Sequence, residues 1–143
     1  MREVVVLDTN VASDLFVRRT LPRQVSEALR GASTAITFVT VGELTKWTDL
    51  RNWGSARRNQ LEGWLSRHEH LEPDDAVAVT WGHLAAAAIR RGRKVSENDT
   101  WIAACCLVDG VPLATLNMKD FVGFARYHGL DLRGVEEAEE LDQ

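Results

Sequence analysis

VVVLDTNVASDLF, residues 4–16, is the stretch that decides the fold of this chain. Its first four residues form the short apolar run that is typical of a strand buried on both faces. Asp8 follows at once, and a carboxylate at the end of a buried strand is unfavourable unless another group pairs with it. Residues 11–19 then have the apolar spacing of a helix. The stretch therefore predicts a core strand, an acid that needs a partner, and a helix.

Strand candidates alternate with helical stretches along the rest of the chain. Strands are expected at residues 3–7, 34–37, 111–115 and 130–135, and helices at 11–19, from 22, from 40 towards 52, and at 56–68, 73–91, 97–108 and 120–127. This alternation predicts an α/β fold around a mainly parallel sheet. No repeat or linker divides the 143 residues, so a single domain over residues 1–143 is expected, with an acidic end at about 131–143.

The composition is that of a soluble globular protein, with 45% apolar and 27% charged residues. The net charge is −4, but residues 131–143 hold six acids and one base, and without them 15 acids face 16 bases. The charge therefore does not exclude a polyanionic partner. No apolar run is long enough to span a bilayer and no secretory signal is recognisable, so a cytoplasmic protein without a membrane partner is expected.

Four acids occupy comparable places near predicted strand ends or in first helical turns: Asp8, Glu43, Asp99 and Asp120. In a parallel sheet the carboxyl ends of the strands meet at one edge, where sites form. Carboxylates that share a cleft repel one another, and a hard divalent cation such as Mg²⁺ or Mn²⁺ removes this conflict. Together, the four acids predict a metal site at this edge of the sheet.

Three of these acids also have a purely structural interpretation. Glu43 follows Thr40 in the spacing of a capping box, and Asp99 follows Ser96 in another N-terminal pattern. Asp120 fits an exposed acid in a first helical turn. Asp8 is different, because capping alone does not require an acid to follow a core strand so abruptly.

Four motifs in a fixed order resemble the PIN-domain ribonucleases, and within them the VapC-type toxins of type II toxin–antitoxin systems. They are VVLDTNVASDLF (5–16), VTVGELTKW (39–47), ENDTWIAACCL (97–107) and PLATLNMKDF (112–121), and the correspondence is weakest over residues 51–91. The resemblance implies a three-layer α/β/α PIN-like domain and an endoribonuclease that depends on one or two Mg²⁺ or Mn²⁺ ions. It also implies a small antitoxin protein as partner and a homodimer.

The resemblance assigns roles to residues of this sequence. Asp8, Glu43 and Asp99 match the metal-binding, catalytic acids of the family, and Asp120 is the choice for the fourth. Many relatives place an acid or amide where Asn117 stands here, so Asp120 lies one helical turn later than that position. Polar residues that support the carboxylates are expected to be Thr9, Asn10, Thr115 and Asn117.

Basic and aromatic residues supply candidates for binding. Contacts to an RNA substrate, which includes structured tRNA or rRNA, are expected from Lys46, Arg51, Arg57, Arg58, Arg93 and Lys94. Each basic cluster is equally consistent with a solvated helix end. An antitoxin groove is expected around Leu15, Phe16, Trp47 and Trp53, although the tryptophans also suit core packing or stacking on unpaired bases.

Two rival classes remain. A strand-end Asp-Thr also occurs in phosphotransferases of the haloacid-dehalogenase type, but these carry a second aspartate where this chain has Asn10. A non-catalytic PIN-like domain that binds RNA or protein is the more serious alternative. Metal-dependent cleavage of RNA distinguishes it from the nuclease.

Overall fold

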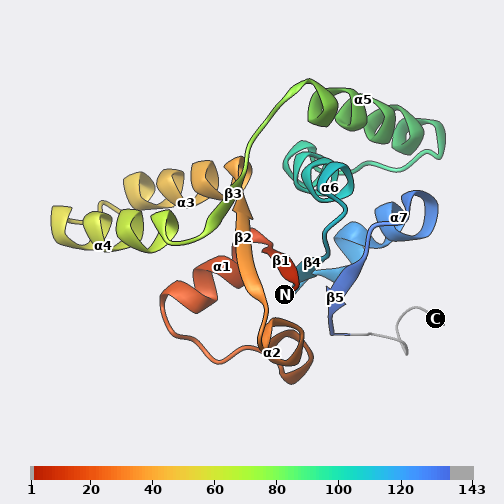
Figure 1. Cartoon of the computed structure of the whole chain (residues 1–143). Helices are drawn as coiled ribbons and strands as arrows, with labels where there is room; N and C mark the ends of the chain where they lie inside the picture. Colours follow the sequence, from red (N-terminus) through yellow and green to blue (C-terminus); the bar gives the residue numbers. More distant parts are fainter. Residues whose placement is uncertain (1, 136–143) are drawn as a thin grey trace.

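The computed structural model describes residues 2–135 and has a central parallel sheet with helices on both faces (Figure 1). The strands are β1 (Val4–Leu7), β2 (Ser33–Thr37), β3 (Glu69–Leu71), β4 (Leu113–Thr115) and β5 (Leu132–Gly134). The helices are α1 (Thr9–Phe16), α2 (Arg23–Leu29), α3 (Phe38–Leu50), α4 (Ser55–Ser66), α5 (Asp75–Arg90), α6 (Glu97–Asp109) and α7 (Met118–His128). The expected three-layer α/β/α fold is confirmed.

The sheet has the order β3-β2-β1-β4-β5, and all of its neighbouring strands run parallel. The chain therefore builds outward from β1 in both directions. The ends of β1 and β4 lie side by side at the point where the order reverses, which is where parallel sheets place their ligands. Asp8 and Thr115 lie at this point.

Alternate residues of the strands enter two separate cores. Val6 and Ala35 pack into one core beneath α5, α6 and α7, while Leu7 and Ile36 pack into another beneath α1 to α4. This is the period of two that a strand imposes on its side chains. In Figure 1 the two sets of helices lie on opposite sides of the sheet.

The sequence predicted four of the strands but not β3. Two of its three residues, Glu69 and His70, are exposed and polar, and the strand lies at the edge of the sheet. Such a strand has no apolar run to reveal it. The predicted helices exist, although α1 and α3 both begin two residues before the predicted starts at 11 and 40.

Of the predicted acidic end at 131–143, residues 136–143 lie outside the described part of the chain. Within residues 2–135, no helix has both the length and the apolar character needed to cross a membrane. Cys105 and Cys106 are buried in α6 as core residues.

Candidate active site

Asp8 is fixed between the end of β1 and the end of β4. Its backbone N–H donates to the carbonyl of Ala114 at 2.9 Å. Its Oδ1 accepts from the Thr9 N–H at 2.8 Å, and its Oδ2 accepts from Thr115 Oγ1 at 2.8 Å. Only 5% of the residue is exposed. The protein therefore holds both carboxylate oxygens in place, which answers the need for a partner that the sequence raised.

Thr9 connects this position to Glu43. The Thr9 hydroxyl donates to Glu43 Oε1 at 2.7 Å and lies 2.9 Å from the hydroxyl of Thr40. The capping-box interpretation of Thr40 and Glu43 is wrong, because α3 is capped by Thr37, whose Oγ1 accepts from the Thr40 N–H. Glu43 is thus free of a capping role and reaches towards the residue that follows Asp8.

Asp99 and Asp120 come from the first turns of two other helices. Ser96 caps α6, as the sequence predicted, and its Oγ accepts from the Asp99 N–H at 3.2 Å. Asp120 is exposed, and its N–H donates to the carbonyl of Asn117 at 3.0 Å. Both acids line one cleft between α7 and the connection from α5 to α6.

The acids affect one another's ionisation. Burial raises the pKa of the Asp8 carboxyl, the hydrogen bonds from Thr115 and Thr9 oppose this, and the charges of Glu43 and Asp120 add to the rise. Burial, followed by the charges of Asp8, Asp120 and Glu43, raises the pKa of Asp99 to about 7. The four acids therefore share one electrostatic environment, although residues 2–135 contain no group of three or more Asp, Glu, His or Cys close enough to hold a metal ion as placed.

The supporting polar residues divide into two groups. Thr9 and Thr115 contact the acids directly, and Thr115 Oγ1 also accepts from the Asn117 N–H at 3.0 Å. The Asn117 side chain makes no capping bond to α7. Asn10 is exposed and lines a different recess, the one between α1 and α3–α4.

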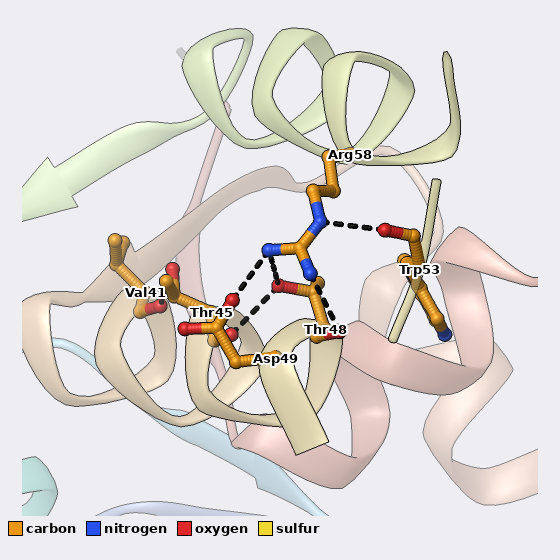
Figure 2. A network of polar contacts seen from close by, with 6 residues as sticks. All are labelled: Val41, Thr45, Thr48, Asp49, Trp53 and Arg58. Carbon is orange, nitrogen blue, oxygen red and sulfur yellow. Dashed lines mark hydrogen bonds and ion pairs between the residues drawn. The ribbon is translucent and has the colours of Figure 1, made fainter. Parts of the chain in front are cut away.

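Arg58 does not reach the acids. Its Nε donates to the Trp53 carbonyl at 2.7 Å, and its two terminal nitrogens donate to the hydroxyl and carbonyl of Thr48 at 3.2 Å each (Figure 2). It also forms an ion pair with Asp49. These bonds close the hairpin of α3 and α4, so the guanidinium serves the fold.

The other basic candidates lie in three places. Lys46 shares a shallow pocket with Glu43, and Arg93 and Lys94 line the cleft of Asp99. Arg51 and Arg57 lie farther along the hairpin, over the rings of Trp47 and Trp53 at 5.4 and 3.9 Å from the ring centroids.

The predicted groove residues gather between α1 and the α3–α4 hairpin. We call this recess the aromatic groove, and its lining includes Asn10, Asp14, Phe16, Trp47, Arg51, Trp53 and Arg57. The rings of Phe16 and Trp53 stack with centroids 6.2 Å apart. Leu15 is partly buried against the core beneath them. The tryptophans therefore pack against the core and also form the floor of the groove.

Sequence reasoning missed three residues around the site. Thr40 lies against Thr9, and Lys119 and Tyr127 line the cleft that contains Asp99 and Asp120. Lys119 is adjacent to Asp120 in the sequence, and this proximity could have identified it. Tyr127 follows Asp120 by seven residues, and only the helical period of α7 places the two on the same face of the helix.

The fold is a parallel sheet between two layers of helices, with acids near the ends of its central strands. The comparison with protein families identifies an α/β domain family to which this chain corresponds. Residues 5–127 match the PIN domain, and the chain belongs to this family.

Particular members of the family resemble the chain along most of its length. It is 35% identical to ribonuclease VapC5 of Mycobacterium tuberculosis over 116 residues, which cover 77% of this chain and 80% of that protein. It is 30% identical to the tRNA(fMet)-specific endonuclease VapC of Shigella flexneri over 118 residues, or 81% and 88% of the two chains.

Solved structures give the same result. The structure of VapBC-5 from Mycobacterium tuberculosis, a member of the VapBC family of toxin–antitoxin systems, matches with a TM-score of 0.68 and 30% identity, covering 92% of this chain and 98% of that one. VapBC2 from Rickettsia felis, solved with a DNA fragment of its promoter, has a TM-score of 0.77 at 21% identity over 93% and 99% of the chains and shares the fold.

Proposed function

We propose that this protein is a metal-dependent endoribonuclease and the toxin of a VapBC-type pair. The observation that carries the proposal is Asp8, a buried acid at the centre of the sheet edge that is fixed by Thr9 and Thr115 and coupled in charge to Glu43 and Asp120. The relatives named ribonuclease or endonuclease VapC support the reaction class. A cytoplasmic site of action and a homodimer are part of the proposal.

The donor set fits a hard divalent cation. Carboxylate oxygens are the ligands that Mg²⁺ and Mn²⁺ prefer. Burial raises the pKa of Asp99, the charges of the other three acids add to the rise, and a bound cation relieves this repulsion. Asp8, Glu43, Asp99 and Asp120 would hold one or two ions. Such ions, when bound, supply an activated water and stabilise the charge that develops on a phosphodiester.

The chain's own residues orient the acids. Thr115 and Thr9 donate to separate oxygens of Asp8 and so set the plane of its carboxylate. The Thr9 hydroxyl also fixes one oxygen of Glu43 and leaves the other without a bond from Thr9. Side chains placed behind the ligands in this way commonly determine metal affinity and ligand orientation.

Metal binding has a direct test. We expect Mn²⁺ to bind the purified protein, so that the electron-spin-resonance signal of free Mn²⁺ decreases as protein is added. Mn²⁺ should bind much more weakly to the Asp8→Asn variant. Glu97→Gln, which removes an acid from the first turn of α6 outside the proposed ligand set, is the control. Equal Mn²⁺ affinity in all three proteins would contradict the carboxylate site.

The aromatic groove is the proposed antitoxin site. Its floor is formed by Phe16, Trp47 and Trp53, and Arg51 and Arg57 lie over the two tryptophans, so it suits an apolar segment that carries acidic side chains. The VapBC complexes among the similar structures support a protein partner.

The resemblance to VapC-type toxins implies that the antitoxin is encoded beside this chain, so the test of the groove is co-purification of the chain with the product of the adjacent gene. Trp53→Ala should release this partner, and Trp81→Ala, a matched change in α5, should not. Retention by both variants would place the partner elsewhere.

A further inference from the structure

A second recess begins at the acids and continues away from them along α7. We call it the basic cleft: its volume is about 570 Å³, and besides Asp99 and Asp120 it is lined by Arg91, Arg93, Lys94, Lys119, Gly123 and Tyr127. The first three of these lie between α5 and α6, and the last three lie on α7. The cleft therefore has basic residues on both walls and contains two of the four proposed catalytic acids, Asp99 and Asp120.

The cations of this cleft are available to a ligand. Among the ion pairs between residues 2 and 135, none involves Arg91, Arg93, Lys94 or Lys119. Arg93, Lys94 and Lys119 are exposed. Three exposed cations that form no ion pair within residues 2–135 lie in the same cleft as Asp99 and Asp120, which suits a polyanion that passes close to those acids.

The far end of the cleft presents an aromatic ring. The guanidinium carbon of Arg91 lies 4.2 Å from the centroid of the Tyr127 ring, and 56% of Tyr127 is nevertheless exposed. The Nε of Arg91 is buried and has no hydrogen-bond partner within residues 2–135. The contact with the ring thus fixes the guanidinium, and an exposed part of the ring remains open to a flat ligand.

Gly123 lies one helical turn before Tyr127 on α7 and also lines the cleft. A Cβ at Gly123 would lie 3.8 Å from Nη2 of Arg91, which is ordinary contact. This part of the cleft wall is therefore helix backbone next to the Arg91 guanidinium.

We propose that the basic cleft seats an unpaired strand of RNA, with phosphates on Arg93, Lys94 and Lys119 and one base stacked on Tyr127. Arg91 is a positioning residue that orients the tyrosine ring. The bases of a duplex already stack on one another, so an exposed ring at the end of a cationic cleft favours an unpaired strand. This inference rests on the proposed ribonuclease function, and it names the form of RNA and the residues that hold it.

The charge contribution is tested by binding in EDTA, where cleavage by the proposed mechanism does not occur. The probe is a fluorescently labelled, unstructured RNA oligonucleotide, and its affinity is measured over a range of salt concentrations. For a single strand, each lost phosphate contact reduces the slope of log affinity against log salt by about 0.7, so Arg93→Gln with Lys119→Gln should reduce it by about 1.4. The control is Arg30→Gln with Arg67→Gln, an equal change in net charge at exposed positions outside the cleft.

Stacking is tested with 2-aminopurine placed in the same oligonucleotide. Binding should quench its fluorescence with the wild-type protein and with Tyr127→Phe, but not with Tyr127→Ala. The affinity of Tyr127→Ala for the oligonucleotide should fall about 10-fold, in the range of one lost base–aromatic contact. Because Tyr127→Phe retains the ring, it separates stacking from loss of the fold.

Several results would overturn the proposal: no binding by the wild type, an unchanged slope in the cleft variant, an equal change in the control, or unaltered quenching with Tyr127→Ala. Tighter binding of the matching duplex than of the single strand would do the same. Since binding is measured without metal, a protein that binds in this manner but never cleaves RNA would refute the ribonuclease and leave the cleft assignment intact.

Discussion

Replacing Asp99 with asparagine should stabilise the metal-free protein. Burial, together with the charges of Asp8, Asp120 and Glu43, raises the pKa of Asp99 to about 7, above its ordinary value of 3.8. The neutral form therefore contributes stability that is fully present below pH 3.8 and is lost as the pH rises through about 7. Asparagine has nearly the same shape and does not ionise, so the variant avoids this loss.

The magnitude follows from the size of the pKa change. Each tenfold change in proton affinity is worth about 1.36 kcal/mol, so a rise from 3.8 to about 7 has an upper limit of about 4 kcal/mol. Asp99 is only half-buried, and solvent screening reduces the expected gain to about 1–2 kcal/mol at pH 8. The gain should shrink towards about pH 4, where the wild-type carboxyl is neutral in the folded protein.

The assay is urea unfolding of the wild type, Asp99→Asn and Glu97→Gln in EDTA at several pH values. Glu97 is the matched control because it lies in the same first turn of α6, where the helix dipole favours an acid. Glu97→Gln should therefore lose up to about 1 kcal/mol, the opposite sign to Asp99→Asn. If Asp99→Asn is less stable than the wild type at pH 8, the raised pKa of Asp99 is refuted.

Three further predictions concern a residue that fixes Asp8, the α3–α4 hairpin and the edge strand β5. Thr115→Val removes the hydroxyl that donates to Asp8 and should lower the free energy of unfolding by about 1–3 kcal/mol. Thr115→Ser keeps this donor and should keep most of the wild-type stability. Equal stability of the two variants in urea unfolding would contradict this prediction. Arg58→Leu should lower the free energy of unfolding by about 1–2 kcal/mol and leave the rate of RNA cleavage unchanged, because the bonds of Arg58 lie within the hairpin. A slower cleavage rate in a folded variant would show that Arg58 also serves the site. Gly134→Ala would place a Cβ 2.5 Å from the Thr115 carbonyl oxygen, so the variant should be about 1–3 kcal/mol less stable and should melt several degrees lower. An unchanged melting temperature would mean that β5 can shift to accommodate the methyl group.

The sequence predicted the features that depend on local pattern. Apolar runs and helical spacing predicted the α/β fold, four of the five strands and the helices, because buried strands and amphipathic helices have characteristic patterns of apolar residues. The edge strand β3 leaves none, since its outward residues are polar. The starts of α1 and α3 were misjudged because Asp8 and Thr37, which cap them, belong to the preceding strand ends.

The site shows the same division. The placement of Asp8 after a core strand was visible in the chain, and so was the cap at Ser96. The bond from Thr9 to Glu43 joins residues 34 positions apart, and no local pattern records such a contact. The basic candidates were chosen from the sequence alone, which does not separate Arg58, whose bonds lie inside the hairpin, from Arg93 and Lys94, which line the open cleft.

Cleavage of RNA by the purified protein tests the central claim most directly. Total cellular RNA containing intact tRNA and rRNA would be incubated with the wild type or Asp8→Asn in Mn²⁺, Mg²⁺ or EDTA, and the new 5′ ends would be mapped. The account predicts discrete ends that require metal and are absent with Asp8→Asn. Cleavage that persists in EDTA or in the variant would contradict the carboxylate mechanism, and intact RNA under every condition would favour a PIN-like domain that binds without cutting.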